Sequence, residues 1–448
     1  MVESNTITQK VDVEKMYYKY FLSALISMIA YSIFNISDGI FIAQSLGDIG
    51  LSAVNIAWPL VGGFIIAIGQ GIGISSSIYI SNLRGKSKVL KKDSEKIKEI
   101  KASAIVLLII IALILTPIMY YFRENIAYLL GARGEAFKPV CDYIEYQIIC
   151  IVLFLLGEGI YPILRNSFKF KEATMIYTAG CISNLILDFV LVTLLNKGML
   201  GAAIGTISSE VIMTFVGLYI VFQDKEEKLK LKHFKINFKV YKDIFKAAIA
   251  PIGLLAVDDL TVIFFIRAAL KYGGIPAQAM YGAVDYLRTI FATLYLALSE
   301  GVQPLMSMAN GEKNEKLKSR LVTKSLKMIV LISIFVGIGL VISRCYLKEI
   351  YNLSNEAMKY ANMAILSRII AMPIYGLVKF FVSYNEASLN IKLANFLVYL
   401  EALIVMPVLS LVIPNIFEIN GVWFAYPLGE LIIVLIAFIF YFKYRRNF

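Results

Sequence analysis

The chain has 448 residues, of which 59% are hydrophobic and 17% are charged, and its formal net charge is +12. A soluble domain carries about 25% charged residues, so this composition argues against a water-soluble enzyme and indicates a protein that a bilayer solvates. The first segment is polar and includes Lys10, Lys15 and Lys19. We therefore expect no cleavable signal peptide, and we expect the N-terminus to stay in the cytosol.

Hydrophobic runs of about twenty residues recur along the chain with polar breaks between them. We interpret them as about twelve transmembrane helices of an all-α, polytopic membrane protein. The spans are predicted at 20–43, 52–82, 102–122, 140–164, 173–195, 200–222, 245–270, 277–308, 322–344, 359–384, 390–413 and 421–442.

The basic residues lie mostly on one side of these predicted spans. The N-terminus, the C-terminus and the loops after even-numbered spans hold 32 of the 44 Lys and Arg, whereas the opposite loops hold eight. The positive-inside rule then places both termini in the cytosol, as in a multi-pass protein of the cytoplasmic (inner) membrane. Because topology accounts for the basic charge, we expect membrane lipids and no nucleic acid as partners.

The two halves of the chain resemble each other. Gly47 and Gly85 flank the second span, and Gly273 and Gly311 flank the eighth span at the same separation. Two six-helix lobes are therefore expected, an N-terminal one at 1–222 and a C-terminal one at 245–448. A cytoplasmic linker loop at 223–244 joins them. Halves with an even number of spans form a parallel repeat around a central cavity.

Catalytic and structural-metal motifs are missing from the sequence. The four cysteines, Cys141, Cys150, Cys181 and Cys345, form no CxxC pair, and His233 is the single histidine. The GQGIG run in the second span lacks the GK[ST] of a phosphate-binding loop. We therefore expect no enzyme activity and no cofactor beyond a coupling ion.

Ionisable residues inside spans are costly and mark a transport pathway by default. Acids dominate this set, which suits cationic cargo. The set comprises Asp38, Glu158, Asp188, Glu210, Asp258, Asp259, Arg267, Asp285, Arg288, Glu300, Lys379, Glu401 and Glu430.

The clearest group lies in the first half. Asn184 and Asp188 are four residues apart and share one helix face, Asp38 lies in the first span, and Thr206 follows the small-residue run GAAIGT. Two carboxylates, an amide and a hydroxyl form an all-oxygen set that suits a proton, or Na⁺ if the protein is sodium-coupled. The alternative, in which the two acids only make structural hydrogen bonds, stays open at this point.

Several segments resemble one family of transporters. These are NISDGIFIAQSLGDIGLSAV, IYISNLRGKSK, LLGARGE, SNLILDFVLV, MLGAAIGT and LSEGVQPLMSMANGEKN. Across the whole chain they are similar to multidrug and toxin extrusion (MATE) transporters, and in detail to the MepA-like bacterial branch.

The resemblance implies two six-helix lobes that form a V-shaped cleft. We expect the protein to be a monomer, although the sequence does not determine its oligomeric state. The resemblance also implies a secondary antiporter that exports organic cations and drugs in exchange for H⁺ or Na⁺ by alternating access. In relatives, a helix-1 Asp, an Asn-x-x-x-Asp pair and a Thr form the cation-coupling site, and here Asp38, Asn184, Asp188 and Thr206 match that pattern.

A second-lobe cation or substrate site is also expected from the resemblance. Asp259 stands eight residues after Pro251, and Asp258, Tyr281 and Glu300 are further candidates. This chain departs from the relatives that use such a site, because it has Tyr375 near the expected helix-10 acid and Lys379 one turn further on. The alternative role for Asp259 is a structural acid paired with an arginine.

The rival function is a lipid-linked saccharide flippase of the same superfamily. Such a protein needs a strongly cationic cavity for pyrophosphate. The excess of acids within the spans argues against it, although Arg267, Arg288 and Lys379 keep it open. The choice between H⁺ and Na⁺ also stays open, because the same oxygen ligands serve both ions.

Overall fold

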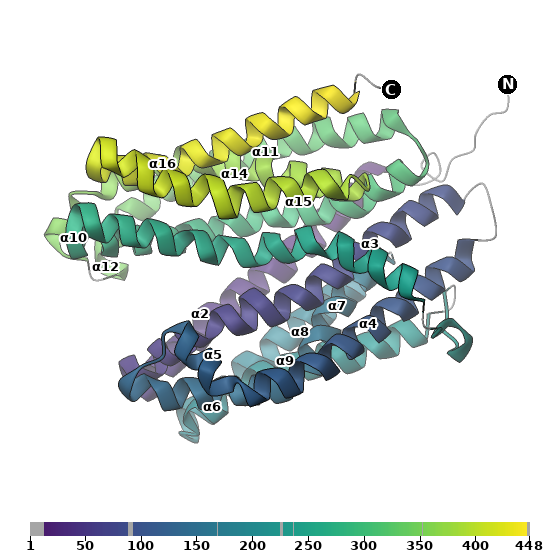
Figure 1. The fold of residues 1–448 in the computed structure, drawn as a ribbon, viewed down its shortest axis with the longest axis horizontal. Coiled ribbons are helices and arrows are strands. Elements are labelled where there is room, and N and C mark those ends of the chain that lie inside the picture. Colours follow the sequence, from purple (N-terminus) through teal and green to yellow (C-terminus); the bar gives the residue numbers. More distant parts are fainter. Residues whose placement is uncertain are drawn as a thin grey trace. The chain divides into compact units, whose positions relative to one another are not determined.

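The computed structural model describes residues 13–87, 93–167, 169–224, 227–235, 237–351 and 353–445, and within these ranges it contains helices and no strand (Figure 1). Seven helices in these ranges are long and apolar enough to cross a membrane. The number rises to eight if the bent pair Gly134–Ile149 and Ile151–Asn166 forms one span. The expected all-α membrane fold is thereby confirmed.

The chain divides into two compact units. Unit 1 comprises Met1–Ala256 and Ser307–Lys313, and unit 2 comprises Val257–Met306 and Asn314–Phe448. The boundary falls inside one long helix, α10 (Phe238–Gly311), rather than in the loop at 223–244.

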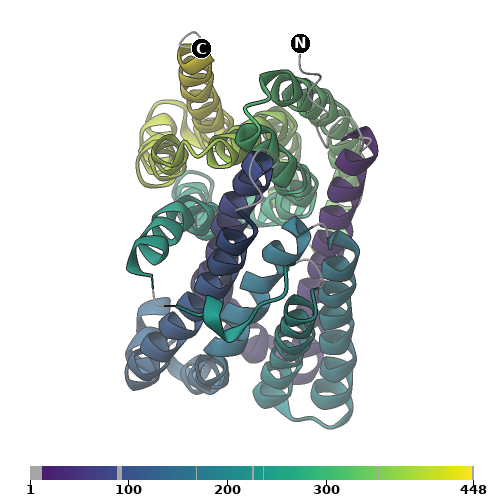
Figure 2. The same ribbon diagram turned by 90° about the vertical axis from the view of Figure 1, so that its right-hand side faces the viewer.

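Unit 1 is a bundle of helices that pack along their lengths. Its α-helices are α2 (Val13–Leu60), α3 (Ala67–Ser87), α4 (Asp93–Tyr121), α5 (Arg123–Leu130), α6 (Phe137–Ile149), α7 (Ile151–Asn166), α8 (Phe170–Asp188) and α9 (Gly198–Phe222). Short π-helical segments, η1 (Val61–Ile66) and η3 (Phe189–Leu194), and 3₁₀ turns, η2 (Gly134–Ala136) and η4 (Leu231–His233), connect them. The α8 helix packs against both α9 and α2, and α7 packs against α3 and α9 (Figure 2).

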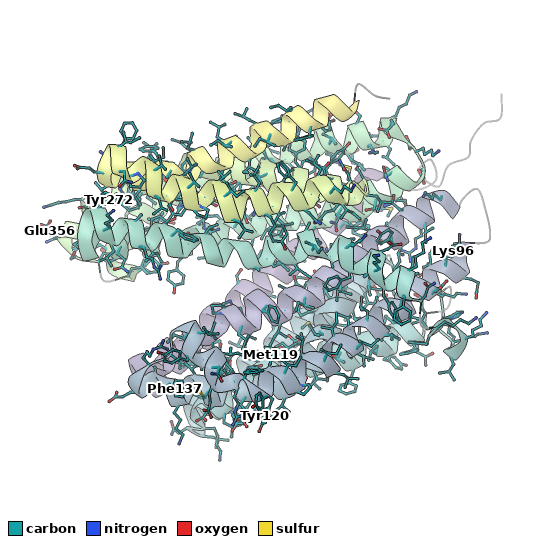
Figure 3. All side chains as sticks on the ribbon, in the orientation of Figure 1. Lys96, Met119, Tyr120, Phe137, Tyr272 and Glu356 are labelled. Carbon is teal, nitrogen blue, oxygen red and sulfur yellow. The ribbon has the colours of Figure 1, made fainter. Side chains whose placement is uncertain are left out.

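The interior of unit 1 is apolar. Met119 of α4 is buried in it, and Phe137 of α6 packs against it (Figure 3). Large apolar side chains also stay exposed on the outer face of the bundle, for example Phe215 and Tyr219 of α9. Apolar residues on both faces are typical of helices that lie between a protein core and lipid.

Ion pairs gather the basic loops at one end of unit 1, which we call the basic end. Glu227 pairs with Arg84 at 2.7 Å and with Lys101 at 2.5 Å, and Asp224 pairs with Lys169 at 3.2 Å. Part of the predicted linker loop is thus bound to unit 1. The loops that meet here are the ones that the positive-inside rule assigns to the cytosol.

Unit 2 contains the rest of α10, then α11 (Glu315–Arg344), α12 (Leu347–Ile350), α13 (Asn355–Met358), α14 (Ala361–Ala387), α15 (Ile391–Leu400), the π-helical η5 (Glu401–Val405) and α16 (Met406–Arg445). Two of these helices break where two predicted spans meet. Gly274 interrupts α10 with φ 67°, a left-handed value that glycine adopts without a steric penalty. Glu418 interrupts α16 with φ 49°.

The structure also differs from the predicted spans in unit 1. The α2 helix continues to Leu60, through the polar break expected between the first two spans, because no proline interrupts it before Pro59. The fourth predicted span is bent by 62° at Cys150 into α6 and α7. Hydrophobicity sets the length of a span, but it does not report such bends.

Candidate functional site

Four buried polar residues of unit 1 lie where α2, α8 and α9 pack together. Asp38 comes from α2, Asn184 and Asp188 from one face of α8, and Thr206 from α9. Asn184 and Asp188 are fully buried, and Thr206 and Asp38 are only 2% and 4% exposed. The structure therefore brings together the four residues that the sequence placed in one cation site, which we call the Asp188 cluster.

Asp188 is the centre of this cluster. Its carboxyl group interacts with the carboxyl of Asp38 and with the amide of Asn184. On the α9 side, Gly205 leaves the space for it, because a Cβ at this position would overlap Oδ1 of Asp188 and would lie 3.2 Å from Nδ2 of Asn184. The absence of a side chain at Gly205 is thus a condition for the site.

Two residues of α6 complete the cluster and were missed in the sequence. Tyr143 and Gln147 are fully buried, and the Tyr143 hydroxyl approaches Thr206 and Gln147. The two are four residues apart within an apolar span, so their shared polar face could have been noticed. Nothing in the sequence placed that face opposite α8 and α9.

The polar atoms of the cluster are poorly satisfied by the protein itself. Among the described residues, both carboxylate oxygens of Asp188, both amide atoms of Asn184, the amide atoms of Gln147, the Tyr143 hydroxyl and Oδ1 of Asp38 have no well-aligned hydrogen-bond partner. Buried polar atoms without partners are rare and costly. A bound proton or a hard cation with oxygen ligands would satisfy several of them.

The two acids have no basic partner among the residues that the structure describes. In the parts of the chain that the structure describes, neither Asp38 nor Asp188 forms an ion pair with Lys or Arg. Two neighbouring carboxylates away from water interact so strongly that they bind protons as a coupled pair. The residues therefore fit either a shared proton or one Na⁺. In the described ranges no cluster of three or more His, Cys, Asp or Glu side chains that could hold a metal ion occurs.

The helix changes its hydrogen bonding directly after Asp188. The π-helical η3 begins at Phe189, so the α8 backbone gains an extra residue per turn immediately beyond the cluster. This π-helical segment is the last part of the helix, which ends at Leu194. The segment follows the residue at the centre of the cluster.

The residues predicted for a second-lobe site do not form one group. Tyr281 and Glu300 both lie on α10 and are 19 residues apart, which is about 28 Å along a helix. Glu300 is instead close to the buried Glu386 of α14. The side chains of Asp258 and Asp259 lie outside the described residues.

Tyr281 belongs to a different kind of cluster in unit 2. The guanidinium of Arg368 lies over the rings of Tyr281 and Tyr426, at 4.9 and 4.7 Å from their centroids. Asp285 pairs with Arg288 at 2.7 Å and with Arg368 at 3.4 Å. These ring faces and this acid are already in contact with cations that belong to the protein.

Comparison with known sequences gives one family and a set of relatives. The sequence profile of the MatE family matches residues 23–190. The chain is 24% identical to Multidrug export protein MepA of Staphylococcus haemolyticus over 95% of this chain and 92% of that protein. It is 25% identical to Multidrug export protein MepA of Staphylococcus saprophyticus over 95% of this chain and 91% of that protein.

Solved structures share the fold over almost the whole chain. An outward-facing multidrug resistance MATE transporter of the MOP superfamily matches with a TM-score of 0.89 at 18% identity, covering 98% of this chain and 97% of that one. A MOP-superfamily transporter from Pyrococcus furiosus, described as having a binding pocket of reversed polarity, matches with a TM-score of 0.88 at 18% identity, covering 96% and 95%.

Proposed function

The chain belongs to the MATE family of multi-pass membrane transporters, and from this premise we propose that it exports small organic cations and drugs in exchange for H⁺ or Na⁺ by alternating access. Membership of this family makes the protein a transporter and not an enzyme. The names of its relatives, multidrug export proteins, support the direction of transport and the class of cargo.

The observation that carries the proposal is the Asp188 cluster. It holds two buried carboxyl groups without a basic partner among the described residues. The amides of Asn184 and Gln147 and the hydroxyl of Tyr143 lie beside them and have no well-aligned hydrogen-bond partner there. Such a site gains stability when a proton or Na⁺ binds and loses it when the cation leaves. It therefore suits a reversible coupling ion better than a structural role.

Coupling requires only that cargo and ion favour different conformations. An ion that binds the Asp188 cluster more tightly in one state shifts the population towards that state. Cargo that prefers the other state is then released as the ion binds, and the effect is reciprocal. Asp188 and Asp38 hold the ion in this scheme, Asn184 and Thr206 supply neutral oxygens, and no cofactor is needed.

We place the protein in the cytoplasmic membrane of a bacterium, with both termini in the cytosol. The gathering of basic loops at the basic end of unit 1 supports this orientation. We also propose that it acts as a monomer among membrane lipids.

Transport by purified protein in liposomes tests the proposal. Ethidium movement is measured against imposed pH and Na⁺ gradients for wild type, Asp188→Asn and a control, Glu172→Gln, whose side chain is exposed on the same helix. We expect Asp188→Asn to lower gradient-driven transport by about 100-fold, and we expect the control to match wild type. The gradient that drives wild-type transport identifies the coupling ion.

A lipid-linked saccharide flippase is the second candidate, favoured by the buried Arg288 and Arg368 of unit 2. Both arginines already contact Asp285, and Arg368 also contacts two tyrosine rings, so less of their charge remains for a pyrophosphate. If neither gradient moves ethidium, and a fluorescent polyprenyl pyrophosphate crosses the same liposomes, the flippase replaces the antiporter.

A further inference from the structure

A second pair of buried carboxyl groups lies in unit 1. Glu158 of α7 and Glu210 of α9 are 2% and 3% exposed, and they interact electrostatically. The position of Glu210 depends on Gly157, because Oε2 of Glu210 lies only 2.6 Å from where a Cβ of Gly157 would be. A larger residue at this position would push Glu210 away from α7.

Among the described residues, no lysine or arginine forms an ion pair with Glu210. Its neighbours are Glu158 on α7 and Cys181 on α8, and Gln70 of α3 donates a 2.7 Å hydrogen bond from Nε2 to Oε2 of Glu158. Within the described ranges Glu210 forms no ion pair, and its Oε2 has no hydrogen-bond partner. An ionised carboxylate in this position would be strongly disfavoured.

This pair lies one helical turn from the Asp188 cluster. Thr206 and Glu210 are four residues apart on α9, and the two positions share one face about 6 Å apart along the axis. Cys181 and Asn184 stand in the same relation on α8 at a spacing of three. Polar groups therefore occupy two successive layers between these helices.

About two helical turns beyond Gln70, a second set of polar contacts lies along the α3–α7 interface and reaches the basic end. Gln70, Ser77, Ser81 and Arg84 follow one face of α3 at helical spacing. The Ser77 hydroxyl donates to the carbonyl oxygen of Pro162 at 2.8 Å, Ser81 donates to the side chain of Asn166, and Arg84 donates to its backbone oxygen. Arg84 then pairs with Glu227.

We propose that Glu158 and Glu210 form a second proton-binding site of unit 1, and that protons pass through it on their way to the basic end. The inference rests on the proposed antiport and adds a proton step that the Asp188 cluster alone does not provide. A proton binds as an O–H bond on one carboxylate oxygen and leaves by breaking that bond, so no group is oxidised or reduced. Cation coupling at the Asp188 cluster by Na⁺ or H⁺ does not depend on it.

The first test asks whether the pair holds a proton. Infrared difference spectra of the purified full chain at neutral pH report protonated carboxyl groups through their C=O stretching band, which ionised carboxylates lack. We expect Glu210→Gln to remove part of this band. Glu172→Gln, at an exposed position of α8, is the control and should leave the band unchanged. A spectrum of Glu210→Gln without any loss of the band would overturn the proposal.

The second test asks whether the proton moves during transport. Protons released per ethidium are counted with a pH-sensitive dye inside the liposomes, beside equilibrium binding of ethidium. We expect Glu210→Gln and Glu158→Gln to slow pH-driven transport by about tenfold or more, while ethidium affinity stays within about twofold of wild type, because the pair is not expected to touch cargo. Unchanged rates and proton counts in both variants would contradict the inference.

The two proposals fail separately. If Asp188→Asn stops transport while both glutamate variants behave as wild type, the proposed antiport is supported and the second proton-binding site is contradicted. If wild-type transport follows Na⁺ alone and releases no protons, the result is the same. If Asp188→Asn transports normally, the proposed coupling site itself falls. Melting temperatures of all variants show that the comparison is made between folded proteins.

Discussion

Two clusters, the Asp188 cluster of unit 1 and the Arg368 cluster of unit 2 (Asp285, Arg288 and Arg368), treat buried charge in opposite ways. In unit 1, Asp38, Asp188 and Glu210 are buried, and among the described residues none of them is paired with Lys or Arg. In unit 2, Asp285 contacts both Arg288 and Arg368, and Glu401 lies 3.5 Å from the buried Lys379. Both clusters meet the cost of burying an acid, but by different means.

The difference lies in the positive charge that compensates the buried acid, which can bind and leave in one case and is part of the protein in the other. An acid with no basic partner in an apolar layer is stabilised by whatever cation reaches it, and that cation can leave again. An acid paired with an internal arginine or lysine has its counter-charge built in, and removal of either partner leaves the other exposed to the apolar layer. The Asp188 cluster is therefore suited to coupling, and the Arg368 cluster to a fixed structure.

The largest stability effect is expected in unit 2. Arg368→Met should leave Asp285 with one partner and remove the cation from two tyrosine rings, at a cost of about 3–5 kcal/mol in the free energy of unfolding. Thermal unfolding in detergent measures it. Arg344→Met, at an exposed arginine, is the control. Equal melting temperatures for wild type and Arg368→Met would mean that the arginine is not structural, and the contrast between the two clusters would fail.

In unit 1, steric blocking of the Asp188 cluster should come next. In Gly205→Ala the added Cβ overlaps the Asp188 carboxyl, so we expect a loss of about 1–3 kcal/mol together with loss of gradient-driven transport. Gly282→Ala serves as control, since a Cβ there meets nothing within 4 Å. Normal transport by Gly205→Ala would show that Asp188 does not need its observed position.

A smaller effect is expected when one hydroxyl is removed from the cluster. Tyr143→Phe should slow coupled transport by about tenfold, which corresponds to about 1.4 kcal/mol. It should leave the melting temperature unchanged, because the hydroxyl has no well-aligned partner in the described structure. Tyr146→Phe, on the same helix, is the control. A fall in melting temperature with unchanged transport would assign Tyr143 a structural role instead.

The smallest effect concerns the basic end. Burial raises the pKa of Glu227, but the charges of Arg84 and Lys101 outweigh burial, and the net pKa lies below the ordinary value of 4.5. The ion pairs therefore stabilise the folded chain above pH 4.5, and this contribution is lost as the pH falls further. We expect Glu227→Gln to lower the free energy of unfolding at neutral pH by about 1 kcal/mol. In a plot of melting temperature against pH, the variant should also lose less stability below pH 4.5 than wild type. If the melting temperature of the variant fell with pH as steeply as that of wild type, the Glu227 ion pairs would not be the cause of the acid destabilisation.

Much of this architecture could be predicted from the sequence. Runs of apolar residues and the distribution of Lys and Arg set the membrane class and orientation, because the bilayer acts on each span separately. The i, i+4 spacing of Asn184 and Asp188, together with the family resemblance, identified four members of the cluster. His233, by contrast, lies in a charged loop of the sequence, where a solvated side chain is the default expectation. It is buried, accepts a hydrogen bond from the backbone of Lys230 and lies 3.2 Å from Glu95.

The sequence by itself determined which residues lie within spans and which helix face carries polar groups, since both follow from local periodicity and the cost of burying charge. Only the tertiary structure decided which faces meet. It placed Tyr143 and Gln147 beside Thr206, left space at Gly205 for Asp188, and set Glu210 against Gly157, within electrostatic range of Glu158. Such contacts depend on how helices distant in sequence pack, and no single helix carries that information.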